Sequence, residues 1–72
     1  MKDELKTAIL KSLSEKIETN ELDWASMYIV EQYQLAQETP DEAEISKARL
    51  RMKDIEARLK WLRSFHAKEL SE

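Results

Sequence analysis

The stretch TPDEAEISKARLRMKDIEARLKWLRSFHAKEL, from Thr39 to Leu70, decides the fold of this chain. It opens with a helix-start signal, in which Thr39 offers an N-cap hydroxyl, Pro40 takes the first helical position and Glu42 completes a capping box. No glycine or further proline follows Pro40, so nothing in the pattern interrupts the helix. The sequence therefore predicts one helix of about thirty residues and about 45 Å.

Apolar residues in this stretch repeat with a heptad spacing. The repeating positions are Ile45, Ala48, Met52, Ile55, Leu59 and Leu62, and His66 takes the next one. Such an a/d pattern predicts a buried seam. Two interpretations stay open, because the seam can be the core-facing stripe of a helical bundle or a coiled-coil surface that also pairs chains.

A second set of apolar side chains lies roughly opposite the seam. It consists of Leu50, Ala57, Trp61 and Phe65. A helix with one core to face does not need two apolar sides, and tryptophan is frequent in binding hot spots. The candidate partner-binding residues are Leu50, Trp61, Leu62 and Phe65, although the same side chains would also serve to cover a core.

Two shorter helices are predicted before Thr39. In the first, at about residues 3–18, Leu5, Ile9, Leu13 and Ile17 recur every four residues. Asn20 is a suitable N-cap for the second, at about residues 21–37. That second helix has one apolar face made of Leu22, Ala25, Ile29, Tyr33 and Ala36 and another made of Trp24, Tyr28 and Leu35. Helices that are apolar on most sides are usually central.

Composition fixes the fold class. The 72 residues include no glycine, no cysteine and a single proline, which leaves β-hairpins without turn residues and excludes disulfides. We predict one all-α domain over residues 1–72, a three-helix chain with two short antiparallel helices packed on a long helix at about 40–70. Laid side by side, the short helices would leave residues 55–65 uncovered; laid end to end, they would not. A chain this small often gains stability by oligomerisation, so a coiled-coil or bundle dimer is an option.

Basic residues concentrate in the stretch 47–63. The candidate basic patch is Lys47, Arg49, Arg51, Lys53 and Arg58. Like charges spaced by four residues repel one another in a helix, so an acidic counterpart is expected. Three counterparts are possible: acidic residues of the first half of the chain (Glu15, Glu18, Glu21, Asp23 or Glu31), an acidic partner protein, or a nucleic-acid backbone.

Catalytic and ligand-binding motifs are missing from the sequence. The single histidine, His66, lies on the helix seam, and there is no glycine-rich phosphate loop. We therefore expect neither an enzyme nor a cofactor or metal site. The charged start of the chain does not resemble a signal peptide, and no apolar run is long enough to span a membrane, so the expected location is cytoplasmic.

The function expected from these features is that of a small helical protein-protein interaction module, such as an adaptor, inhibitor, co-chaperone or regulatory subunit. It would act through the exposed faces of the helix at 40–70, and its partner would be another protein or a second copy of the chain. The alternative is a nucleic-acid-binding regulator that uses the basic stretch 47–63. The net charge of −3 disfavours that alternative.

Overall fold

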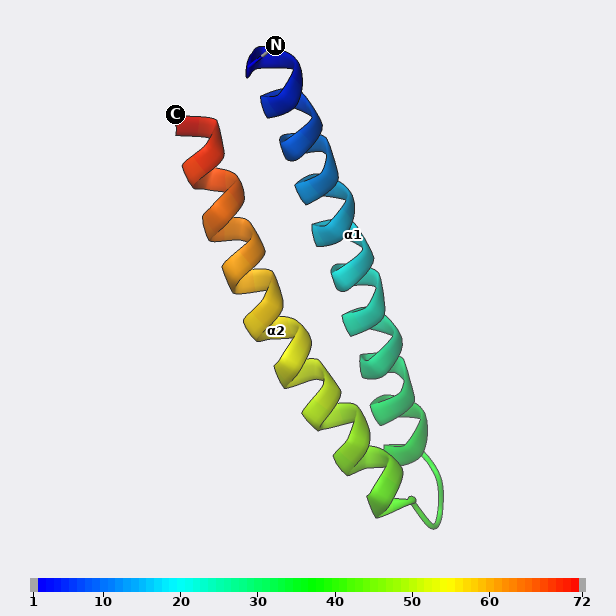
Figure 1. Cartoon of the computed structure of the whole chain (residues 1–72). Helices are drawn as coiled ribbons and strands as arrows, with labels where there is room; N and C mark the ends of the chain where they lie inside the picture. Colours follow the sequence, from blue (N-terminus) through cyan, green and yellow to red (C-terminus); the bar gives the residue numbers. More distant parts are fainter. Residues whose placement is uncertain (1, 72) are drawn as a thin grey trace.

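The computed structural model describes residues 2–71, which form two helices, α1 (Lys2–Leu35) and α2 (Glu42–Ser71). The helices lie side by side and antiparallel, and residues 36–41 join them, so the two ends of the chain lie at the same end of the molecule (Figure 1). The hairpin measures 58 × 14 × 13 Å. Each helix therefore has one side against its neighbour and its remaining sides toward the outside.

The prediction of a three-helix chain is wrong, because α1 continues through residues 18–20 without a break. Asn20, the predicted N-cap, lies inside α1 with only 8% of its surface exposed. Its Nδ2 donates to the carbonyl of Lys16 at 2.7 Å, and its Oδ1 accepts from Arg58 Nη1 of α2 at 3.2 Å. Asparagine costs less than about 0.7 kcal/mol relative to alanine inside a helix, so without glycine or proline the helix does not end here.

The side of α1 that faces α2 has its own heptad pattern. Its positions are spaced by alternating steps of three and four residues, and all are buried or half-buried: Leu10, Leu13, Ile17, Asn20, Trp24, Met27, Glu31 and Gln34. Leu5 and Ile9, which were predicted to share the stripe of Leu13, lie outside it and are exposed. The continuous 3–4 spacing is that of an antiparallel coiled coil.

The predicted seam of α2 is confirmed as a buried surface. All six of its apolar positions are buried, and they are Ile45, Ala48, Met52, Ile55, Leu59 and Leu62; His66 is half-buried. The seam packs against α1 of the same chain. Of the two arrangements considered for residues 55–65, the one that leaves no overhang is closer to the structure: Leu62 is covered, because α1, with 34 residues, is longer than α2, with 30.

The connection between the helices is short, as predicted, but its cap differs. The residue that caps α2 is Asp41: its Oδ1 accepts from the backbone N–H groups of Ala43 at 3.0 Å and Glu44 at 3.3 Å. The Asp41 N–H in turn donates to Gln34 Oε1 of α1 at 3.1 Å. Thr39, the predicted cap, lies two residues before it. The carboxylate of Asp41 also carries the negative charge that a helix N-terminus favours.

Replacing Asp41 with alanine is expected to lower the free energy of unfolding by about 0.5–2 kcal/mol, because two N–H groups of α2 lose their acceptor. Urea unfolding followed by circular dichroism at 222 nm measures this change. The matched control is Thr39→Ala, for which we expect no measurable loss. Equal losses in the two variants, or a larger loss for Thr39→Ala, would contradict the assignment of Asp41 as the cap.

Candidate interaction surface

The side of α1 opposite the seam carries a second heptad stripe, which we call the outer face of α1. Its positions are Leu5, Ala8, Ser12, Glu15, Thr19, Leu22, Ser26, Ile29 and Tyr33, and every one is exposed. Most of them lie two residues beyond a seam position, about 200° around the helix. The helix predicted at 21–37 is therefore not central, since its apolar face at Leu22, Ile29 and Tyr33 points away from α2.

Near the turn, the outer face of α1 has few charged neighbours on its own helix. From Trp24 to Gln37 the only residue charged at neutral pH is Glu31, and Glu31 turns to α2, where its Oε2 accepts from Arg49 Nε at 2.7 Å. Leu22, the apolar position before this segment, lies between Glu21 and Asp23 in sequence. Tyr28 and Leu35 are also exposed, but they lie nearer the seam, more than about 100° around the helix from the outer face. Large exposed apolar side chains on one face mark interaction sites in soluble proteins.

The structure separates the four partner-binding candidates predicted on α2. Leu62 is buried in the seam, whereas Leu50 and Trp61 are exposed. Phe65 is half-buried and stacks on Trp61, with ring centroids 5.2 Å apart and an angle of 11° between the rings. Leu50 lies about 16 Å from Trp61 along the helix axis, with Lys53, Asp54 and Arg58 between them in sequence. The exposed apolar side chains of α2 are thus divided by charge.

A second stacked aromatic pair lies on α1, at one edge of the seam. The rings of Trp24 and Tyr28 are 5.5 Å apart and nearly parallel, and Trp24 Nε1 donates to Glu56 Oε2 of α2 at 3.1 Å. Together with Met52 and Lys53 they line a shallow groove. Trp24 is half-buried, so this pair mainly covers the edge of the core.

Three arginines of the basic stretch form ion pairs or hydrogen bonds with side chains of α1. Besides the Arg49–Glu31 pair, Arg63 Nη2 lies 2.7 Å from Glu21 Oε2, and Arg58 donates to Asn20. Two of the acidic residues predicted as counterparts, Glu21 and Glu31, thus have that role.

Of the other predicted basic residues, Lys47 lies 3.9 Å from Glu44 of its own helix. Arg51 and Lys53 are exposed, and among residues 2–71 neither forms an ion pair. The stretch therefore presents a few separate charges to solvent.

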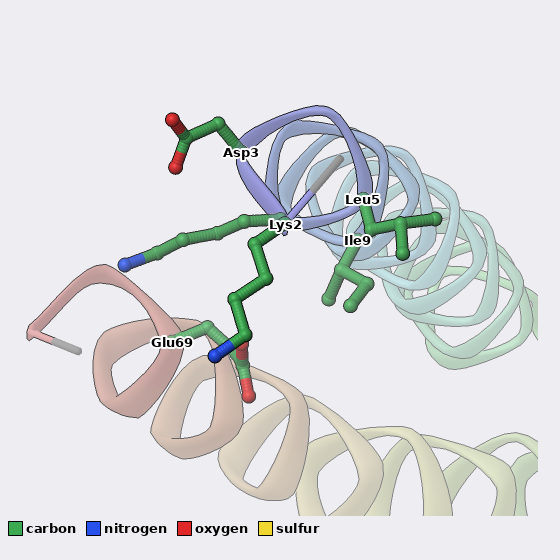
Figure 2. Close-up of a pocket in the computed structure, with 6 residues that line it drawn as sticks. Lys2, Asp3, Leu5, Ile9 and Glu69 are labelled. Atoms are coloured by element: carbon green, nitrogen blue, oxygen red, sulfur yellow. The ribbon is translucent and has the colours of Figure 1, made fainter.

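A shallow depression lies between the helix ends at the open end of the hairpin. It is lined by Lys2, Asp3, Leu5, Lys6 and Ile9 of α1 and by Glu69 of α2. Figure 2 shows Leu5 and Ile9 on one side of α1, with Asp3 pointing away from them and Glu69 contributed by α2. Of the two apolar residues that line the depression, Leu5 belongs to the outer face of α1, whereas Ile9 lies outside both the seam and the outer face.

His66 lies near the same end, and Ser14 Oγ is 3.4 Å from its Nε2. A serine nucleophile needs its histidine oriented by a third group, and within residues 2–71 no hydrogen bond reaches the other ring nitrogen. The described residues also hold no cluster of three His, Asp or Glu side chains able to bind a metal ion. Neither helix has a segment long and apolar enough to cross a membrane over this range.

Comparisons of the chain with protein-family models, with curated proteins and with solved structures find no match.

Proposed function

We propose that the chain is a non-enzymatic protein-protein interaction module that binds a helical surface through the outer face of α1. The observation that supports this proposal is the exposed 3–4 stripe with its large apolar side chains Leu22, Ile29 and Tyr33. A helix normally turns such a stripe toward a core, and the seam already fills that role in the hairpin. A partner helix is the complement of a stripe with this period.

The choice of α1 over α2 rests on the distribution of charge. On α2, the exposed Leu50 and Trp61 alternate with charged residues. On α1, the segment from Trp24 to Gln37 offers an outer side without charge. Nucleic-acid binding through residues 47–63 is less supported, because Arg49, Arg58 and Arg63 already bond with Glu31, Asn20 and Glu21.

A photo-crosslinking experiment tests the proposal. A benzoyl-phenylalanine replaces Tyr33 in one variant and Trp61 in the matched control, two aromatic positions of nearly equal exposure, 63% and 62%. In cells that express the chain, we expect a protein adduct from position 33 that disappears when Leu22→Asp is added, and none from position 61. Adducts from position 61 alone, or no adduct from position 33, would refute a role for the outer face of α1.

A further inference from the structure

We infer that a second copy of this chain covers the outer face of α1, with the two α1 helices antiparallel, so that two hairpins form one layer of four helices with the two α1 helices at its centre. This inference rests on the proposed function and names its partner. It draws on three independent observations: the excess surface of the hairpin, the length of the outer face, and the charges of the two halves of α1.

The hairpin exposes more surface than a compact protein of its mass. Its accessible surface is 5755 Å², against about 4,650 Å² for a folded monomer of this mass. Its radius of gyration is 16.5 Å, against about 11 Å for a compact chain of this length. The excess is about 1,100 Å², which is similar to the roughly 800 Å² that each partner buries in a stable interface. One further contact along a helix removes an excess of this size.

The outer face spans α1 from Leu5 to Tyr33, and five of its nine positions are apolar: Leu5, Ala8, Leu22, Ile29 and Tyr33. A globular partner contacts only part of such a rod, whereas a second α1 has the same length and the same period. In an antiparallel pair with its two-fold axis between residues 20 and 21, Ala8 lies opposite Tyr33 of the second copy. In the same register Ser12 lies opposite Ile29 of the second copy, and small side chains then face large ones along both ends of the interface.

Charge selects the antiparallel orientation. Residues 2–17 of α1 carry four lysines and three acids, a net charge of +1, whereas residues 18–35 carry four acids and no base: Glu18, Glu21, Asp23 and Glu31. A parallel pair would set the acidic half against itself, and like charges opposed across an interface are unfavourable. The antiparallel pair sets residues 24–35 against residues 6–17, which contain three of the lysines, while Glu18, Glu21 and Asp23 of both copies lie near the axis. Near the centre of the interface between the two α1 helices, Lys16 on the flank of the outer face lies beside Asp23 of the second copy.

Sedimentation equilibrium of the full chain at several concentrations tests self-association. We expect a species of twice the 8.5 kDa of one chain. Leu22→Asp places two carboxylates close to the two-fold axis, next to Glu15 of the second copy, and is expected to weaken the dimer about 100-fold or more. Leu50→Asp is the matched control, since Leu22 and Leu50 are exposed to 62% and 66%; we expect its dissociation constant to stay within about threefold.

Circular dichroism at a concentration where both variants are monomeric checks that they remain helical. A wild-type chain that stays monomeric at the highest concentrations refutes the inference. So does equal weakening by Leu50→Asp. If the chain is monomeric while position 33 still gives a crosslink to a different protein, the self-pairing fails and the interaction module stands. If both the dimer and the crosslink are missing, both fail.

The register has its own test, because the chain contains no cysteine. In the double variant Ala8→Cys/Tyr33→Cys the two thiols of one chain lie about 37 Å apart along α1, so a disulfide between them must join two chains. We expect rapid disulfide-linked dimers from the double variant and little from either single variant. Efficient self-linkage of the single variants would indicate a parallel pair and refute the antiparallel arrangement.

Discussion

Replacement of Leu62 by alanine is expected to lower the free energy of unfolding by about 2–5 kcal/mol, the usual cost of truncating a buried leucine. Leu62 lies in the seam with 5% of its surface exposed. A single core of this size supplies only about 3–5 kcal/mol in total, so a large fraction of the variant should be unfolded at 25 °C. Thermal and urea unfolding followed by circular dichroism measure the loss.

The matched control is Leu50→Ala on the same helix, where the leucine is exposed. We expect its effect to stay within about 0.5 kcal/mol. Both variants have to be measured at the wild-type chain concentration, because dimerisation makes the apparent stability depend on concentration. A small loss for Leu62→Ala, together with loss of partner binding, would instead mean that Leu62 is a contact residue, as the sequence pattern allowed.

The sequence predicted α2 well because its seam positions are apolar. Ile45, Met52, Ile55 and Leu59 follow the heptad without a polar interruption, and no residue after Pro40 ends the helix. The exact start was missed, since Thr39 and Asp41 both satisfy the pattern of an N-cap. Only the structure, in which Asp41 accepts from Ala43 and Glu44, distinguishes the two.

The same reasoning failed for α1 because its seam is partly polar. Asn20, Glu31 and Gln34 occupy seam positions, and the side-chain oxygen of each accepts a hydrogen bond from a residue outside α1: Arg58, Arg49 and Asp41. A search for apolar repeats passes over such positions and instead joins Leu5 and Ile9 to Leu13. The apolar members of the seam, Leu10, Leu13, Ile17, Trp24 and Met27, keep the 3–4 spacing only when the polar Asn20 is counted with them.

The candidate surface was predicted only in part. The sequence marked the apolar face at Leu22, Ile29 and Tyr33 but placed it in a core, since a three-helix chain needs a central helix. With one helix in place of two, that face has no intrachain neighbour. The ion pairs of the basic stretch were predicted better. The sequence indicates Glu31 and Glu21 as acidic counterparts, and in the antiparallel hairpin they pair with Arg49 and Arg63.

Replacement of Asn20 by leucine is expected to raise the free energy of unfolding by about 1–3 kcal/mol. A buried leucine contributes about 1.5–3 kcal/mol, whereas Asn20 takes a buried seam position and fills it with an amide that bonds to Lys16 and Arg58. Arg58 is exposed, so water replaces the bond it loses. Urea unfolding at fixed chain concentration measures the gain.

The gain should come with a loss of specificity, because one polar residue in a coiled-coil seam fixes register and oligomeric state at a cost in stability. An all-apolar seam near residue 20 lets α2 shift along α1 or exchange with α2 of a second chain. We expect broadened mass distributions in light scattering for Asn20→Leu, and a loss of about 1 kcal/mol without such broadening for Arg58→Ala, which removes one partner of the amide. A destabilised Asn20→Leu variant with a single sharp mass would mean that Asn20 stabilises the hairpin and does not select its register.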